Sequence, residues 1–105
     1  MSPRPLGYAT LAVLQAVYDG HRYGFDIADH TGLASGTVYP ALATLTRKGL
    51  VTSSWEDQDV ANSEARPRRR YYAVTGEGVL AREEALSRFH AMGLAHPRPA
   101  GGGHG

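Results

Sequence analysis

The sequence contains no cysteine, and this absence limits the chemistry that the chain can carry. Disulfide bonds and thiolate zinc sites are excluded, which fits a reducing compartment. Long apolar runs are also missing, because the stretch from Leu11 to Val17 is short and includes Gln15. Such a stretch cannot cross a bilayer, and no signal-type cleavage site follows it. We therefore expect a soluble cytoplasmic protein that has no membrane partner.

The chain also has almost no net charge. Its formal charge is +1 at pH 7, so bulk charge gives no reason to expect nucleic-acid binding. The local distribution is uneven, however, since residues 66–70 read Arg-Pro-Arg-Arg-Arg. Acidic residues concentrate on either side of this run, at 56–64 and 77–84. This asymmetry predicts a positive patch on a nearly neutral protein.

Patterns of catalytic and metal-binding residues are missing as well. The five histidines show no metal-ligand spacing, and no cysteine is present to join them. The string GLASG at 32–36 resembles a nucleophile elbow, but its serine comes one place too late and no strand precedes it. We therefore expect no catalytic residue, no metal and no cofactor, and hence a protein that is not an enzyme.

The first half of the chain predicts three helices. Apolar residues recur at three- and four-residue steps in residues 9–19, 24–30 and 35–48. A glycine follows each segment, in the place where a left-handed residue commonly ends a helix. In the second helix the pattern favours burial of either Phe25 or Ile27.

The second half predicts two strands and a last helix. Residues 50–56 and 70–75 alternate in polarity, as half-buried strands do. The segment between them is polar and interrupted by proline, which predicts a hairpin with a long loop at its tip. Thr75 can cap a helix over residues 76–92.

Three helices followed by a hairpin is typical of a winged helix-turn-helix, an α+β fold that is mainly α. We expect a DNA-binding domain over residues 1–75, a C-terminal dimerisation helix over 76–93 and a disordered tail over 94–105. Trp55 and Tyr72 are expected to pack in the core beneath the hairpin.

The third helix has the position of a reading helix. Its apolar stripe consists of Val38, Ala41, Leu42 and Leu45. The candidate DNA contacts lie on or beside its other face, and they are Ser35, Thr37, Tyr39, Pro40, Thr44 and Lys48. Ser35 fits a plain helix N-cap as well as a base contact. The free N–H groups of Gly36 and Thr37 can hold a phosphate. Pro40 comes so early that the hydrogen bond it removes is a tolerable loss.

The hairpin supplies a second group of candidate DNA contacts, namely Arg66, Arg68, Arg69 and Arg70. A guanidinium group suits phosphates or a narrow minor groove. Strand alternation sends Arg69 and Arg70 to opposite faces, so one object cannot engage all four. The alternative interpretation is a solvated cluster that Glu64 and the aspartates of the same loop neutralise.

The last helix carries more apolar surface than a small core requires. Val79, Leu86 and Phe89 lie along one side, and Leu80 lies on another. We expect a homodimer interface here, because two-fold symmetric operators need two reading helices about 34 Å apart. The alternative is that this helix only completes the core.

Five segments carry a family resemblance: Leu6-Gly7, Tyr23-Gly24-Phe25, SGTVYPALATLTRKGLV at 35–51, Trp55-Glu56 and RRRYYAVTGEG at 68–78. Together they resemble the PadR family of bacterial transcriptional regulators, in particular its small subfamily with a single C-terminal helix. The resemblance implies a homodimeric repressor whose third helix and wing contact an inverted-repeat operator in double-stranded DNA. It also implies a small hydrophobic or aromatic effector that relieves repression.

Two functions from different classes fit these observations. The first is a dimeric, sequence-specific DNA-binding regulator. The second is a winged-helix adaptor that uses its last helix and wing to bind a protein partner. The two differ in whether the basic side chains and the N-terminus of the third helix share one face.

Overall fold

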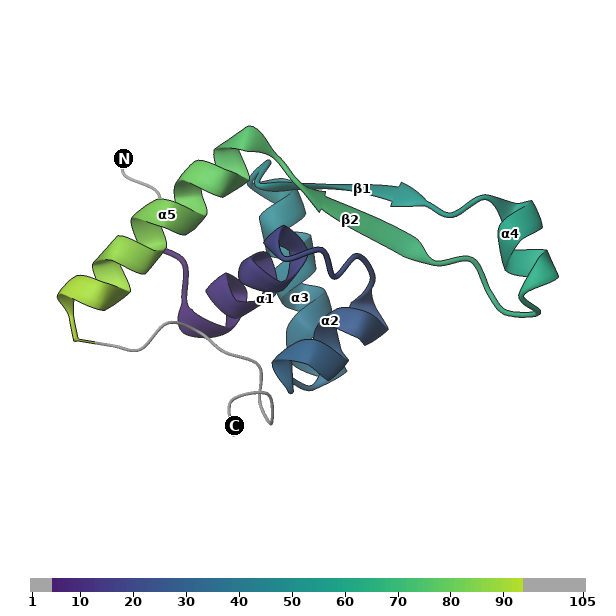
Figure 1. The fold of residues 1–105 in the computed structure, drawn as a ribbon, viewed down its shortest axis with the longest axis horizontal. Helices are drawn as coiled ribbons and strands as arrows, with labels where there is room; N and C mark the ends of the chain where they lie inside the picture. Colours follow the sequence, from purple (N-terminus) through teal and green to yellow (C-terminus); the bar gives the residue numbers. More distant parts are fainter. Residues whose placement is uncertain (1–4, 94–105) are drawn as a thin grey trace.

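The computed structural model describes residues 5–93, so the predicted tail at 94–105 lies outside the described residues. Its helices are α1 (Tyr8–Tyr18), α2 (Gly24–Thr31), α3 (Ser35–Arg47), α4 (Gln58–Ser63) and α5 (Gly76–Ala91), and its strands are β1 (Val51–Trp55) and β2 (Arg70–Val74). The first three helices form a compact body, β1 and β2 extend from it as a wing, and α5 lies across its other side (Figure 1). This order confirms the predicted winged helix-turn-helix.

The core lies where α1, α2 and α3 meet the base of the wing. Its largest fully buried side chains are Leu11, Val13, Leu14, Ile27, Val38, Leu42, Leu45 and Val51. Burying each of them stabilises the fold by about 1.5–3 kcal/mol. In α2 the buried residue is Ile27, whereas Phe25 is 80% exposed. Gly32 and Gly49 have positive φ angles and end α2 and α3, as the sequence predicts.

The wing is an antiparallel pair whose register runs from Val51 opposite Val74 to Trp55 opposite Arg70. Tyr72 packs against the core, as expected. The expectation that Trp55 does the same is wrong, because its side chain is 55% exposed. Val51 and Trp55 do share a strand face, but only the base of the wing lies over the helices. Trp55 is the last residue of β1, and the end of this strand lies beyond the helical body (Figure 1).

The tip of the wing is not the polar loop that the sequence predicts, because it contains the short helix α4. The Asp57 side chain caps this helix by accepting a hydrogen bond of 2.7 Å from the N–H of Asp59. Ala61 is fully buried at the tip. Ala65 follows with a φ of 53°, which turns the chain back toward β2. A short helix of this kind has too few apolar residues for its period to be recognised in the sequence.

The start of α3 also differs from the prediction, because Ser35 is its first helical residue and not its N-cap. Ala34 occupies the N-cap position, and no side chain caps the helix. The carbonyl of Ala34 accepts the first helical hydrogen bonds, from the N–H groups of Thr37 (2.8 Å) and Val38 (3.0 Å). Thr31 fixes the preceding turn, since its Oγ1 accepts a hydrogen bond from the N–H of Leu33.

Thr75 caps α5 as predicted, accepting a hydrogen bond of 3.0 Å from the N–H of Gly78. A Cβ atom at Gly78 would overlap the carbonyl of Leu50, so only glycine permits this close crossing of α5 over the start of β1. Further along α5, the Nε of Arg82 donates a 2.7 Å hydrogen bond to the Oε1 of Gln15 in α1. No helix within residues 5–93 is long and apolar enough to span a membrane.

Candidate nucleic-acid interface

The outer face of α3 presents the residues that the sequence singled out. Val38, Ala41, Leu42 and Leu45 are buried, while Ser35, Thr37, Tyr39, Pro40 and Lys48 are exposed and Thr44 is partly exposed. The division into two faces is therefore as predicted. It follows from the helical period, which places an apolar residue over the core at every third or fourth position.

The N-terminus of α3 offers backbone donors, although not the two that the sequence suggested. The N–H of Thr37 is bonded to the carbonyl of Ala34. The first two helical residues, Ser35 and Gly36, are the ones whose N–H groups have no intrahelical acceptor. Both residues are exposed, and nothing lies within 4 Å of the position of a Cβ atom at Gly36. An anion can reach this end of the helix, where the helix dipole favours negative charge.

Tyr39 projects from α3 toward α2. Its ring packs so closely on the backbone of Gly24 that a Cβ atom there would overlap it. The side chain nevertheless remains 48% exposed. Tyr39 thus packs against α2 with part of its side chain and leaves the rest accessible. A packing role and a surface role are therefore compatible for this residue.

Three arginines of the wing stack on aromatic rings. The guanidinium groups of Arg68 and Arg70 lie 5.1 and 5.3 Å from the centre of the Trp55 ring. That of Arg69 lies 4.0 Å from the centre of the Tyr23 ring. The three arginines thus stack on two different rings, and these contacts do not neutralise their charges.

Arg66 is held differently from the other three arginines. Its guanidinium forms a bidentate pair with Glu56, with Nη1–Oε1 and Nη2–Oε2 distances of 2.6 and 2.9 Å. This bond is the largest cause that lowers the pKa of Glu56 to about 2 against the effect of burial, and hydrogen bonds from Tyr71 and the backbone of Arg69 contribute to the same shift. The pKa of Arg66 is raised by the same bond. Within residues 5–93 the only other contact between a basic side chain and a carboxylate at this range joins the Nδ1 of His21 to Asp26 at 3.0 Å. Arg68, Arg69 and Arg70 therefore have no carboxylate partner among the described residues.

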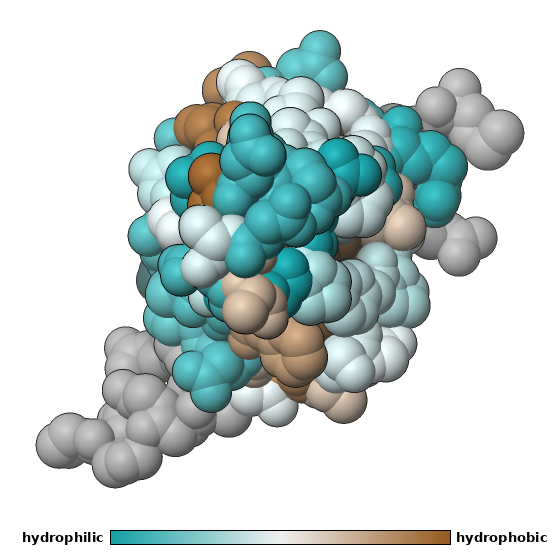
Figure 2. Space-filling view, turned by 90° about the vertical axis from the view of Figure 1, so that its right-hand side faces the viewer, coloured by the Kyte–Doolittle hydropathy of each residue, from teal (hydrophilic) through white to brown (hydrophobic). Residues whose placement is uncertain are grey.

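A groove of about 570 Å³ brings most of these side chains together between the wing and the α2–α3 pair. It is lined by Tyr23, Gly24, Phe25, Tyr39, Trp55, Tyr72 and residues 66–70. Burial raises the pKa of Tyr72. Viewed onto the wing tip, the surface is mainly hydrophilic, with separate apolar patches (Figure 2). The groove therefore offers unpaired cations beside exposed aromatic rings, a composition suited to a phosphate backbone with sugars or bases.

The groove also contains residues that the sequence argument did not place in the site, namely Tyr23, Phe25 and Trp55. The hairpin register indicates the position of one of them, Trp55. Trp55 pairs with Arg70, so it lies among the arginines and far from the base of the wing. The helical pattern of α2 could not have placed Phe25 in the groove, because the pattern predicts only which residues face the core.

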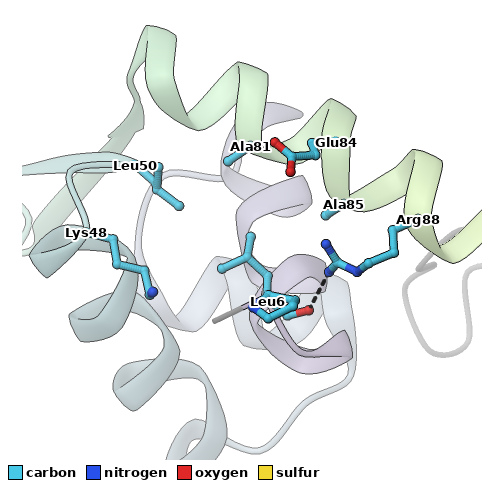
Figure 3. Close-up of a pocket in the computed structure, with 8 residues that line it drawn as sticks. Leu6, Lys48, Leu50, Ala81, Glu84, Ala85 and Arg88 are labelled. Carbon is cyan, nitrogen blue, oxygen red and sulfur yellow. Dashed lines mark hydrogen bonds between the residues drawn. The ribbon is translucent and has the colours of Figure 1, made fainter. Parts of the chain in front are cut away.

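Lys48 lies apart from the groove. It borders a second pocket, of about 320 Å³, between the end of α3 and α5 (Figure 3). The apolar part of this pocket comes from Leu6, Leu50, Ala81 and Ala85, and its charged part comes from Lys48, Glu84 and Arg88. Arg88 closes one end by donating a 3.0 Å hydrogen bond to the carbonyl of Leu6.

The predicted dimerisation residues lie on α5 outside this pocket. Val79, Leu86 and Phe89 are each partly buried, and the Phe89 ring meets the Tyr8 ring edge-on at 5.9 Å. Leu80 is 66% exposed, as is usual for a residue that faces away from the body. Part of the apolar surface of α5 is therefore used against α1, and part remains accessible.

Comparisons with known proteins agree with this architecture. The model of the transcriptional regulator PadR-like family matches residues 13–84. A PadR family transcription regulator from Clostridium difficile R20291 has a similar structure, with 26% identity, a TM-score of 0.71 and coverage of 83% of this chain and 92% of that one. A transcriptional regulator from Clostridium thermocellum (21% identity, TM-score 0.67, 83% and 84% coverage) and a PadR-like transcription factor from Bacteroides fragilis (22%, 0.67, 80% and 82%) share the fold. No curated protein matches the sequence.

Proposed function

This chain belongs to the PadR-like family of transcriptional regulators, and we propose that it acts as a homodimeric repressor of an inverted-repeat operator. The coarser function, a DNA-binding transcription regulator that is not an enzyme, follows from the family. The finer proposal assigns recognition to α3 and phosphate contacts to the wing. The observation that carries it is that Tyr39 and the unpaired arginines Arg68, Arg69 and Arg70 line one groove.

In this proposal Thr37, Tyr39 and Pro40 read base edges in the major groove, and Ser35 and Thr44 lie beside them. Helix-turn-helix proteins place the N-terminal half of the reading helix in the major groove, which agrees with the exposure of these residues. The N–H groups at the start of α3 hold a phosphate. Arg68, Arg69 and Arg70 hold the flanking backbone, since their charge is free for it.

Arg66 and Lys48 have smaller parts in the proposed interface. Arg66 is largely committed to Glu56, so it supports the wing more than it binds DNA. Lys48 contacts a phosphate only where the duplex reaches the end of α3. The same basic groove argues against the protein-adaptor function. A protein partner would need acidic groups to match the arginines, and it would leave the exposed start of α3 without a role.

Residues 76–93 are proposed to join two copies through Val79, Leu86 and Phe89, leaving residues 1–75 to bind one half-site each. An effector, small and hydrophobic or aromatic, is proposed to bind the pocket beside α5 (Figure 3). Its volume of about 320 Å³ is at the small end of the range for ligand sites. A ligand there would contact both α5 and the end of α3, and so could change the angle between the dimer contact and the reading helix.

The test is a titration of duplex DNA fragments, selected from the source genome by the purified protein, at several salt concentrations. Arg68→Ala and Arg69→Ala should each weaken binding to all sequences and reduce the slope of log K against log salt by about 0.9. Unchanged affinity and slope in both wing variants would show that the wing does not contact phosphate. No binding of any duplex at micromolar wild-type protein and low salt would favour the adaptor.

A further inference from the structure

Glu56 is the first residue after β1, and its side chain joins separate parts of the wing. The residue is only 6% exposed. Its Oε1 accepts hydrogen bonds from the Nη1 of Arg66 and from the backbone N–H of Arg69 (3.3 Å). Its Oε2 accepts from the Nη2 of Arg66 and from the hydroxyl of Tyr71 (2.8 Å). One carboxylate thus connects the segment before α4 with the segment after it, at the point where the two strands of the wing end.

The Tyr71 ring extends this connection toward the helices. It meets the Tyr23 ring edge-on at 6.0 Å, and the guanidinium of Arg22 lies 4.8 Å from its centre. The backbone follows the same path, since Tyr23 forms a β-bridge with Tyr71. The N–H of Tyr72 also donates a 2.7 Å hydrogen bond to the carbonyl of Arg22. The middle of β2 is therefore fastened to the turn that precedes α2.

That turn leads directly to the proposed reading helix. Tyr23 is the N-cap of α2, and Gly24, the next residue, supports the ring of Tyr39. The Tyr23 ring also carries the guanidinium of Arg69. A continuous series of contacts therefore runs from Glu56 through Tyr71, Tyr23 and Gly24 to Tyr39, and its last three residues line the groove.

We propose that Glu56 is a positioning residue for DNA binding: it holds the wing arginines at a fixed distance from Tyr39 without touching DNA itself. The inference rests on the proposed function, because it takes α3 and the wing as the two contacts to be aligned. An acidic residue at a DNA-binding face is otherwise unfavourable, since its charge repels the phosphates. Glu56 is tolerated there because it is buried and because Arg66, Arg69 and Tyr71 donate hydrogen bonds to its carboxylate.

The proposal can be separated from simple electrostatics by the sign of one effect. Glu56→Gln removes a negative charge and releases Arg66, so electrostatics alone predicts tighter binding and a steeper salt dependence. Loss of positioning predicts the opposite on both counts, because the arginines no longer reach their phosphates together. The salt slope also excludes a purely structural explanation, because a variant that is less stable but still folded keeps the slope of the wild type.

The experiment compares Glu56→Gln with Asp59→Asn, which removes an equal charge from an exposed position in α4. Both are titrated with a genome-selected duplex and with an unrelated duplex of equal length, below the unfolding transition measured by circular dichroism. We expect Glu56→Gln to bind the selected duplex about tenfold more weakly, the order expected when a buried hydrogen bond to a charged group is lost. Its salt slope should be smaller. Asp59→Asn should bind as tightly as the wild type or more tightly.

Equal or tighter binding by Glu56→Gln, with an unchanged or steeper salt slope, would overturn the proposal. If Glu56→Gln does not fold, Tyr71→Phe decides the matter, since it removes one hydrogen bond to Glu56 and no charge. Weaker binding of the selected duplex by Tyr71→Phe supports positioning, and wild-type binding overturns it. Arg68→Ala in the same assay distinguishes a failure of the positioning role of Glu56 from a failure of the proposed wing contact. If Arg68→Ala weakens binding and Glu56→Gln does not, the positioning role is wrong and the wing contact stands. If Arg68→Ala binds like the wild type, the proposed wing contact is itself wrong.

Discussion

The ring of Tyr39 in α3 lies directly on the backbone of Gly24 in α2, where no other residue type fits without displacing it. This contact joins the two helices of the helix-turn-helix at the start of α2. It also holds a half-exposed phenol at the edge of the groove that the wing arginines line. The same side chain thus belongs to the packing of the fold and to the proposed DNA contact, and the two contributions can be measured separately.

Gly24→Ala should destabilise the protein by about 1–3 kcal/mol, because the added methyl group forces the Tyr39 ring out of its place. Gly76→Ala is the matched control, since Gly76 is also the first residue of its helix and nothing lies within 4 Å of a Cβ atom there. That variant should be neutral or slightly more stable, as alanine favours a helix over glycine by up to about 1 kcal/mol. Urea denaturation measures both. Equal effects in the two variants would mean that Tyr39 adapts freely.

Tyr39→Ala should weaken binding to the selected operator by about 1–3 kcal/mol more than binding to random DNA, as the loss of a base contact does. Tyr39→Phe keeps the ring on Gly24 and removes the hydroxyl, which also packs there, so Tyr39→Phe should lose the hydrogen bonds of the hydroxyl with a smaller loss of packing than Tyr39→Ala. Competition gel shifts with the two kinds of duplex measure the difference. An equal loss on both kinds would make Tyr39 a residue that positions α3 and does not read sequence.

Acid should destabilise the wing through Glu56. The Arg66 bond lowers the pKa of Glu56 from 4.5 to about 2 in the folded protein, so between these values the unfolded chain binds more protons. The stability that Glu56 contributes is therefore complete above about pH 4.5 and is lost as the pH falls toward 2. The urea midpoint of the wild type should drop more steeply over this window than that of Glu56→Gln. Parallel curves would show that Glu56 titrates normally.

Arg82→Ala should cost about 1–3 kcal/mol of stability, because it leaves the nearly buried Gln15 without its hydrogen-bond donor. It also removes a guanidinium that lies 3.9 Å from the centre of the Tyr18 ring. Arg47→Ala is the control, since Arg47 is exposed and makes only a 3.4 Å contact with Thr44. Thermal unfolding followed by circular dichroism compares them. A shift in Arg82→Ala no larger than the control would show that α5 is held on α1 by apolar contact alone.

Leu86→Ser and Phe89→Ser should shift the protein from dimer to monomer at micromolar concentration, since each removes apolar surface from the proposed interface on α5. Val60→Ser removes an equally apolar but distant side chain, 47% exposed on α4, and should leave the assembly unchanged. Sedimentation velocity measures the outcome. A dimer that persists in both α5 variants would place the interface elsewhere.

Most of the fold was predictable from local signals. The apolar period of α1 and α3, the glycines that end the helices and the Thr75 cap act over a few residues, so they can be recognised in the sequence. The same period separated Val38, Leu42 and Leu45 from Thr37, Tyr39 and Pro40. Two of the wrong expectations are local, since the α3 N-cap is Ala34 and the wing tip contains α4, whereas the error at Trp55 concerns tertiary position. Trp55 has the alternation of a core residue, but the wing carries it beyond the core.

The sequence by itself determined the order of the elements other than α4, the two faces of α3 and the cluster of arginines on the wing, because each depends on residues that are close along the chain. Tertiary structure alone decided which arginines remain free. Glu56 pairs with Arg66 across the α4 segment, while Arg68, Arg69 and Arg70 stack on Trp55 and Tyr23. Charge neutralisation depends on distances of a few ångströms between side chains, and these distances are fixed only when the wing forms and β2 packs against the turn before α2.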